Sequence, residues 1–290
     1  MSENNSFSPF TIRCGGRLVS FDKPALMGIL NVTQDSFYDG GRYLSENQYI
    51  ERARQIVGEG ADIIDIGVVS TRPGAILMDP ADEAEKLAGI VAAVRRELPE
   101  ALISVDTCFS VPARAAVAAG ADIVNDISGG AFDDRMFSTV AELQVPYVLM
   151  HNLATPDKMQ ECTSYDNFLN DVVRFFSERL DTLRKIGVAD VILDPGFGFS
   201  KNLEQNYELF AALPQLRMLF PETPLLVAVS RKSMIYKLLG LSPQEALNGT
   251  VALHAAALLS GAQLLRVHDV AAARQTVEIV SMIQKQSVEK

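Results

Sequence analysis

The chain has 290 residues, of which 48% are hydrophobic, and a formal net charge of −10 at pH 7. That length suits one large domain with a substantial core, and the composition is ordinary for a globular protein. The negative charge argues against a surface for nucleic acid or anionic membranes, so any anionic ligand needs a local cluster of Arg and Lys.

The three cysteines are far apart and lack metal-ligand spacing, which predicts reduced thiols in a cytoplasmic protein. Residues 1–10 have neither the basic start nor the apolar stretch of a signal peptide. No window approaches roughly 18 uninterrupted apolar residues, so no membrane span is expected.

The expected elements follow one rhythm along the chain. Residues 1–10 are expected to be disordered or extended, and residues 11–290 to form one domain. A Gly-Gly pair within residues 11–22 predicts a β-hairpin. Strands are then predicted at 25–30, 63–66, 102–105, 123–124, 147–150, 191–193, 225–229 and 264–267. Helices are predicted at roughly 46–58, 81–97, 112–119, 133–143, 165–186, 203–213, 244–259 and 271–285. Alternation of eight strands with eight helices predicts an α/β fold, a closed (β/α)8 TIM barrel.

One phrase recurs at three strand entries. It reads Gly60-Ala-Asp-Ile-Ile-Asp, Gly120-Ala-Asp-Ile-Val-Asn and Gly261-Ala-Gln-Leu-Leu-Arg. Each Gly stands where a helix ends and the chain needs a positive φ before the next strand.

Polar residues follow most of the predicted strands. They include Asn31, Asp65, Asp106, Asn125, Asp194, Lys232, Arg266 and His268. The carboxyl ends of barrel strands share one rim, so these side chains are expected to converge there. Segments 31–45, 67–80 and 151–164 are longer than usual strand-to-helix loops, which is typical of lids and binding loops.

Five motifs carry a resemblance to a known family. They are Asn31-Val-Thr-Gln-Asp-Ser-Phe37, Ser70-Thr-Arg-Pro-Gly74, Asp194-Pro-Gly-Phe-Gly-Phe199, Ser230-Arg-Lys-Ser233 and Arg266-Val-His-Asp269. In this order, over about residues 12–280, the chain resembles the dihydropteroate synthases. Those transferases of folate biosynthesis condense (7,8-dihydropterin-6-yl)methyl diphosphate with 4-aminobenzoate on a (β/α)8 barrel and release pyrophosphate. The resemblance also implies binding of sulfonamides and a homodimer formed through the late helices.

The resemblance implies a pterin pocket and a diphosphate site. The pterin residues would be Asp106, Asn125, Asp194, Phe199 and Lys232. Carboxylates and an amide match the adjacent N–H donors of a pterin edge, and Lys232 can donate to its carbonyl and ring nitrogen. The diphosphate residues would be Asn31, Thr71, Arg266 and His268, with Asn31 also near a Mg²⁺ cofactor.

The resemblance further implies a 4-aminobenzoate site and a mechanism. The 4-aminobenzoate residues would be Thr33, Phe37, Arg72, Phe199 and Ser233. Catalysis would rest on Asn31, Asp106, Lys232, Arg266 and His268. Pyrophosphate would leave first, Asp106 would stabilise the resulting cation, and the loops 31–41 and 67–74 would exclude water.

Several polar residues have plainer interpretations. Asp65 is expected to be mostly a structural capping carboxylate, and Arg231 to form a structural ion pair. His254 is expected to be structural, and His151 is either a satisfied core histidine or a pocket residue.

Two alternative functions remain open on the sequence. A methyltetrahydrofolate methyltransferase would share the barrel and the pterin pocket, but it would leave the Asn31, Arg266 and His268 cluster unexplained. A catalytically silent pterin-binding paralogue is the second, because Gln34, Val68 and Val69 depart from the family's usual residues.

Overall fold

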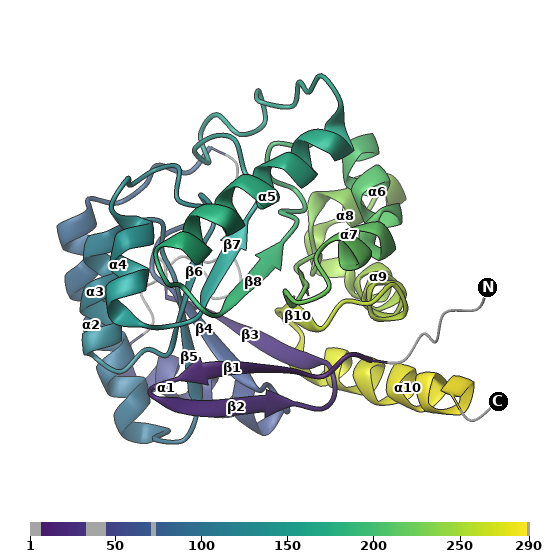
Figure 1. The fold of residues 1–290 in the computed structure, drawn as a ribbon. Helices are drawn as coiled ribbons and strands as arrows, with labels where there is room; N and C mark the ends of the chain where they lie inside the picture. The colour runs from purple at the N-terminus through teal and green to yellow at the C-terminus, as the bar shows by residue number, and fades with distance from the viewer. Residues whose placement is uncertain (1–6, 33–44, 71–73, 289–290) are drawn as a thin grey trace.

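The computed structural model describes residues 7–32, 45–70 and 74–288. Eight parallel strands occupy the middle of the molecule and helices surround them (Figure 1). The strands are β3 (Ala25–Asn31), β4 (Ile63–Gly67), β5 (Leu102–Asp106), β6 (Ile123–Asp126), β7 (Tyr147–Met150), β8 (Val191–Asp194), β9 (Leu226–Val227) and β10 (Leu264–Val267). Their spatial order is β8-β7-β6-β5-β4-β3-β10-β9. A bridge between Leu193 and Leu225 joins β8 to the β9 side, so the barrel is nearly closed and the predicted fold is confirmed.

The helices follow the strands as the alternation predicts. They are α1 (Glu46–Gly58), α2 (Pro80–Glu97), α3 (Ser110–Ala118), α4 (Met136–Leu143), α5 (Phe168–Lys185), α6 (Leu203–Ala211), α7 (Leu213–Leu219), α8 (Ser233–Leu239), α9 (Leu247–Leu259) and α10 (Val270–Val288). A 3₁₀ turn, η1 (Pro243–Glu245), precedes α9. Among the described residues, no helix combines the length and apolar character needed to cross a bilayer.

Two predicted elements have other bounds in the structure for local reasons, and one helix was not predicted. The helix expected at 203–213 is two helices, because α6 ends at Ala211 and Pro214 in the first turn of α7 lacks an N–H donor. The strand expected at 225–229 is regular only at Leu226–Val227. The seven-residue helix α8 was not predicted. It begins after Lys232 and ends at Gly240 with a φ of 65°.

The predicted N-terminal hairpin is confirmed and closes one end of the barrel. Strands β1 (Phe10–Cys14) and β2 (Arg17–Phe21) pair antiparallel, and the turn between them consists of Gly15 and Gly16, both with positive φ. Phe10, Ile12 and Phe21 pack with the first inward-facing residues of the barrel strands, including Ile63 and Leu102. The hairpin therefore covers the amino-terminal ends of the strands (Figure 1).

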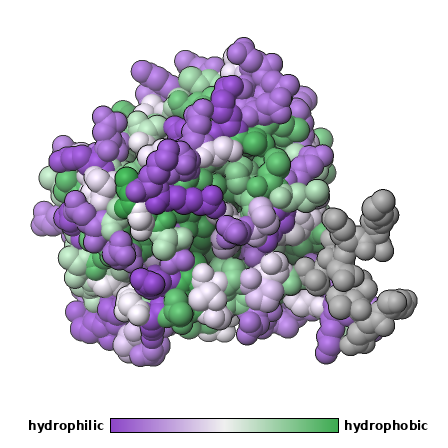
Figure 2. Space-filling view, in the orientation of Figure 1, coloured by the Kyte–Doolittle hydropathy of each residue, from purple (hydrophilic) through white to green (hydrophobic). Residues whose placement is uncertain are grey.

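Strand alternation divides the core into two parts. Residues facing outward from the strands form one large cluster with the helices, and residues facing inward form the cluster that the hairpin covers. On the face shown in Figure 2, hydrophilic residues protrude and hydrophobic residues are visible between them.

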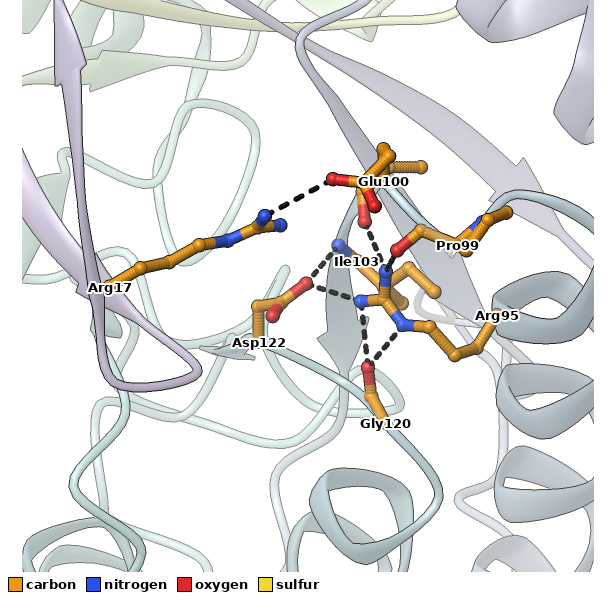
Figure 3. A network of polar contacts seen from close by, with 8 residues as sticks. Arg17, Arg95, Pro99, Glu100, Ile103, Gly120 and Asp122 are labelled. Atoms are coloured by element: carbon orange, nitrogen blue, oxygen red, sulfur yellow. Dashed lines mark hydrogen bonds and ion pairs between the residues drawn. The ribbon is translucent and has the colours of Figure 1, made fainter.

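An arginine side chain binds both the Gly carbonyl and the Asp carboxylate of the repeated Gly-Ala-Asp phrase, an arrangement called here the arginine clamp (Figure 3). Arg95 of α2 donates from Nε and Nη2 to the Gly120 carbonyl at 3.1 and 2.8 Å, and from Nη2 to Asp122 at 2.6 Å. The same Asp122 oxygen accepts the Ile103 N–H at 2.9 Å. One buried carboxylate thus connects α2 to the entries of β5 and β6.

The same clamp occurs at the first copy of the phrase. Arg274 of α10 donates to the Gly60 carbonyl and, at 2.7 Å, to Asp62, whose Oδ2 accepts the Leu26 N–H at 2.8 Å. At the third copy Gln263 replaces the Asp and donates to the Ser8 carbonyl at 2.6 Å.

Arg95→Met should lower the free energy of unfolding by about 2–3 kcal/mol, because a buried carboxylate and several carbonyls lose a charged donor. Urea unfolding measures this loss. Arg96→Met is the matched control, since Arg96 is 64% exposed and its partner Glu46 is 59% exposed. That change should cost less than about 0.5 kcal/mol. Equal losses from both variants would contradict the clamp.

Candidate active site

The carboxyl ends of the strands bring polar side chains to one rim inside the barrel. The strand registers pair Asn31 with Gly67, Gly67 with Asp106, and Asp106 with Asn125. A Cβ at Gly67 would lie 3.4 Å from Oδ1 of Asn31 and 3.5 Å from Cβ of Asp106. Gly67 therefore keeps space open between these two polar side chains.

Arg266 links the polar residues at the centre of this rim. Its Nε donates to Oδ2 of Asp65 at 2.7 Å, and its Nη2 donates to Oδ2 of Asp106 at 2.7 Å. Burial lowers the pKa of Arg266, but the two carboxylates outweigh it and the net shift is upward. The guanidinium therefore remains charged, and both carboxylates hold its orientation.

Asp65 does not act as the cap that the sequence indicated. Its Oδ2 accepts from Nδ2 of Asn125 at 3.1 Å as well as from Arg266, and its Oδ1 is buried without a hydrogen-bond partner. A carboxylate only accepts hydrogen bonds, so the amide nitrogen of Asn125 must face Asp65. This contact turns the amide oxygen of Asn125 away from Asp65.

Several nearby groups act on the pKa of Asp106. Burial raises its pKa to about 7, the Arg266 charge opposes this rise, and the nearby Asp65 and Asp194 add to it. A positive charge arriving beside Asp106 would therefore favour its ionised form at neutral pH.

A second group surrounds the loop that follows β8. Oδ1 of Asp194 accepts the Gly196 N–H at 2.8 Å. Lys232 donates from Nζ to the Phe197 carbonyl at 2.6 Å and lies 4.9 Å from the centre of the Phe199 ring. Burial lowers the pKa of Lys232 to about 8 while Asp194 raises it. Burial likewise raises the pKa of Asp194 while Lys232 lowers it. The two side chains therefore influence each other's charge.

The structure adds Lys201, which the sequence reasoning missed. This buried lysine follows the glycine-rich loop and lies 2.9 Å from Nδ1 of His151. It also donates to three carbonyls, those of His151, Gly196 and Phe199. Its position just behind the loop was the only available signal, and a lysine before a helix is usually exposed. The contact assigns His151, left open by the sequence, to the support of this loop.

His268 and Asn31 occupy the other side of the rim. Burial lowers the pKa of His268 to about 4, with Arg266 acting in the same direction, so the imidazole is neutral at pH 7. The Ser230 hydroxyl oxygen accepts the backbone N–H of His268 at 3.2 Å and lies 3.3 Å from Nδ1 of its ring. The hydroxyl can then donate to Nδ1, which leaves Nε2 as the ring donor. A pocket of about 650 Å³ borders Asn31, His268 and the α1 residue Arg52.

The remaining expected residues lie partly outside the described chain. Thr33, Phe37, Thr71 and Arg72 are outside the described residues. Ser233 is the first residue of α8 and is partly buried.

The structure also places the residues that were expected to be structural and two residues that depart from the family's usual pattern. Arg231 forms a two-bond ion pair with Asp269, at 2.7 and 2.8 Å, and His254 is buried within α9. Val68 and Val69 pack with the outer core between strands and helices, not with the cluster inside the barrel.

A comparison with protein families finds the family described as "Pterin binding enzyme", which matches residues 27–268. The chain is 41% identical over 287 residues to a dihydropteroate synthase of Synechocystis sp., and 98% of each chain is covered.

Two solved structures have the same fold. The Yersinia pestis dihydropteroate synthase with a sulfonamide drug superposes with a TM-score of 0.89 at 37% identity, covering 95% of this chain and 100% of the other. The Xanthomonas albilineans dihydropteroate synthase with 4-aminobenzoic acid gives a TM-score of 0.86 at 36% identity, covering 96% and 99%. The strand-end carboxylates, the arginine between them and these near full-length matches agree: the chain belongs to the pterin-binding enzyme family, with the dihydropteroate synthases as its relatives.

Proposed function

We propose that the rim residues carry out the dihydropteroate synthase reaction in two adjoining halves, one for the pterin and one for the diphosphate. The observation that carries this proposal is the Asp65–Arg266–Asp106 contact, because it joins both halves through one guanidinium. The substrates are (7,8-dihydropterin-6-yl)methyl diphosphate and 4-aminobenzoate, and the products are 7,8-dihydropteroate and pyrophosphate.

In the pterin half, each side chain has a complementary role. The Gly196 N–H donates to Oδ1 of Asp194, which leaves Oδ2 as the acceptor for the pterin amino and ring N–H groups. The amide oxygen of Asn125, which faces away from Asp65, accepts a further N–H. Lys232 donates to the pterin carbonyl and ring nitrogen, and Phe199 lies against the ring face. A ring without this edge would leave buried groups unpaired and bind much more weakly.

In the diphosphate half, Arg266 and His268 donate to phosphate oxygens, with Asn31 beside them and Thr71 contributing from the second loop. Arg266 and His268 are two residues apart on one chain segment, so both side chains face the interior. The neutral imidazole contributes an N–H at Nε2, and the guanidinium contributes the charge.

The reaction is dissociative in this proposal. The bond between the pterin methylene and the diphosphate oxygen breaks, and its electron pair leaves with pyrophosphate. The Asp106 carboxylate stabilises the cationic methylene, and that cation in turn favours ionised Asp106, whose pKa is raised to about 7. The amine of 4-aminobenzoate is uncharged at pH 7, forms the new C–N bond by attacking the methylene and then loses one proton to water, so no dedicated base is required. The 4-aminobenzoate would lie against Phe199 and Ser233, with Thr33, Phe37 and Arg72 as the further expected contacts.

Mg²⁺ is part of this proposal as a cation that arrives with the diphosphate. Among the described residues, no three His, Cys, Asp or Glu side chains form a metal-binding group. The amide oxygen of Asn31 fits a Mg²⁺ held mainly by substrate oxygens and water, which is the usual mode for this ion. When bound, the ion would neutralise charge on departing pyrophosphate.

The assay for this function uses purified protein, Mg²⁺, the dihydropterin-methyl diphosphate and 4-aminobenzoate. Wild-type protein should form dihydropteroate and release pyrophosphate, and Lys232→Ala should lower kcat/KM by roughly 100-fold or more. Lys237→Ala is the control, because Lys237 is exposed on helix α8, which begins directly after Lys232. Pterin binding without product would instead identify a silent paralogue. Methyl transfer independent of pyrophosphate release would identify the methyltransferase alternative.

Arg266→Gln should weaken pyrophosphate binding about tenfold or more, because a charge-assisted donor is lost. Calorimetric titration with pyrophosphate and Mg²⁺ measures this affinity. Arg274→Gln is the control, since it breaks a similar arginine–aspartate contact at the opposite end of the barrel. Unchanged pyrophosphate affinity in Arg266→Gln would remove Arg266 from the diphosphate site.

A homodimer through the late helices is also part of the proposal. Helix α10 packs against α9, and apolar side chains remain exposed on both: Leu259 is 38%, Ile279 64% and Met282 61% exposed. The alanine-rich segment 251–262 permits close helix packing. Exposed apolar side chains gathered on adjoining helices are typical of a subunit interface.

The double change Ile279→Glu and Met282→Glu should convert dimers to monomers, because charges would be buried at the interface. Sedimentation velocity at several concentrations measures the assembly. Leu18→Glu, at a hairpin residue that is 73% exposed, should leave the dimer intact. A wild-type monomer, or a dimer that persists in the double variant, would contradict this interface.

The cytoplasm is the proposed location. Cys14 and Cys108 are buried free thiols and Cys162 is a partly buried one, which suits a reducing compartment.

A further inference from the structure

Lys201 is surrounded by acceptors. Its Nζ lies 2.9 Å from Nδ1 of His151, 2.9 Å from the Gly196 carbonyl and 2.9 Å from the Phe199 carbonyl, with the His151 carbonyl at 3.3 Å. An ammonium has three N–H donors, which matches the three contacts at 2.9 Å. None of these four acceptors carries a charge, so this site holds a buried lysine through neutral groups alone.

The burial of Lys201 is costly, which makes a purely incidental role implausible on energetic grounds. Burial lowers its pKa well below the ordinary value, with Asp194 opposing the shift and Lys232 adding to it. Burial also lowers the pKa of His151, and Lys201 adds to that shift, so the imidazole is neutral. A neutral imidazole that accepts at Nδ1 carries its proton on Nε2.

The carbonyls that Lys201 holds mark the two ends of the segment 196–199. Gly196 has a φ of 72°, and a Cβ there would lie 2.1 Å from the His151 carbonyl oxygen, so the loop packs directly against the lysine's partner. Asn206 secures the middle, since its Oδ1 accepts the Gly198 N–H at 2.6 Å. The segment is thus fixed at three points, the carbonyls of Gly196 and Phe199 and the N–H of Gly198.

The same segment acts on the pterin side through groups that Lys201 does not touch. The Gly196 N–H holds one oxygen of Asp194, the Phe197 carbonyl accepts from Lys232, and the Phe199 ring lies near Lys232. Displacing either end of the segment would therefore rotate Asp194 and shift Lys232 together.

We propose that Lys201 is a positioning residue for pterin recognition: it holds the segment 196–199 so that Asp194 and Lys232 face the pterin edge. The inference rests on the proposed function, because it assigns the support of that same pterin half. Among the described residues, Lys201 contacts no diphosphate residue, and it contacts the expected 4-aminobenzoate site only through the backbone carbonyl of Phe199. Its loss should therefore weaken pterin binding more than 4-aminobenzoate binding.

The test compares Lys201→Met with wild type, using pterin-6-carboxylic acid as the probe. Lys201→Met should raise the Kd for the probe about tenfold, as expected when a buried charged donor to several acceptors is lost. The KM for 4-aminobenzoate at saturating pterin substrate should change by no more than about twofold, since Lys201 reaches that site only through the Phe199 backbone carbonyl. Lys185→Met, an exposed lysine of α5, is the control and should change neither constant.

The outcomes separate the two proposals. Wild-type protein that does not bind the probe overturns the proposed function, and the role of Lys201 with it. The positioning role alone is overturned if wild-type protein binds the probe and a folded Lys201→Met variant binds it equally well. It is also overturned if that variant loses affinity for both substrates to the same degree. If Lys201→Met does not fold, His151→Phe takes its place, because it deletes one acceptor and leaves the three carbonyls. A selective rise of a fewfold in the pterin Kd supports the proposal, and an unchanged Kd overturns it.

Discussion

The charge on Arg266 is the constraint on which the rim depends. Asp65 and Asp106 lie inside a barrel whose lower layers are apolar, and a carboxylate buried there without a cation would be strongly destabilising. A single guanidinium has enough donors to hold both carboxylates and still face a phosphate. Arg266 therefore has a structural task before any substrate arrives, and its removal affects the protonation of Asp106 as well as anion binding.

The repeated phrase explains how the chain assembles this constraint. Its copies end in Asp65, Asn125 and Arg266, and Oδ2 of Asp65 accepts hydrogen bonds from both of the other side chains. In each copy, the residue three positions earlier makes a hydrogen bond at the start of the strand. These residues are Asp62 and Asp122, which form the clamps, and Gln263, which takes the equivalent place. Each copy thus fixes a strand at its entry and supplies a polar group near its exit. A barrel brings the exits together, although the three copies are far apart in sequence.

The sequence predicted what depends on periodicity and missed what depends on packing. Strand ends, and hence Asp106, Asn125, Asp194 and Arg266, follow from apolar runs that stop at polar residues. The partners of Asp65 could not be predicted, because an isolated Asp after a strand has the same pattern whether it caps a helix or binds an arginine. The position of Lys201 just behind the glycine-rich loop was only a weak signal, since its carbonyl partners surround it only in the folded loop. Helix α8 is too short for the helical period of its apolar residues to be recognised. Pro214 divides residues 203–213 and beyond into two helices, where the apolar pattern predicted one.

The two lysines beside the glycine-rich loop show why residue type alone does not identify a catalytic group. Lys232 and Lys201 both approach the same glycine-rich loop, and burial lowers the pKa of each. Lys232 contacts one carbonyl and has further donors to offer a ligand, with Asp194 nearby to favour its charge. Lys201 lies among four acceptors, all protein groups, which leaves it no donor for a substrate. The difference lies in how many acceptors the fold supplies. A loop that uses one lysine on each of its sides can therefore hold its shape and still present a cation to the pterin.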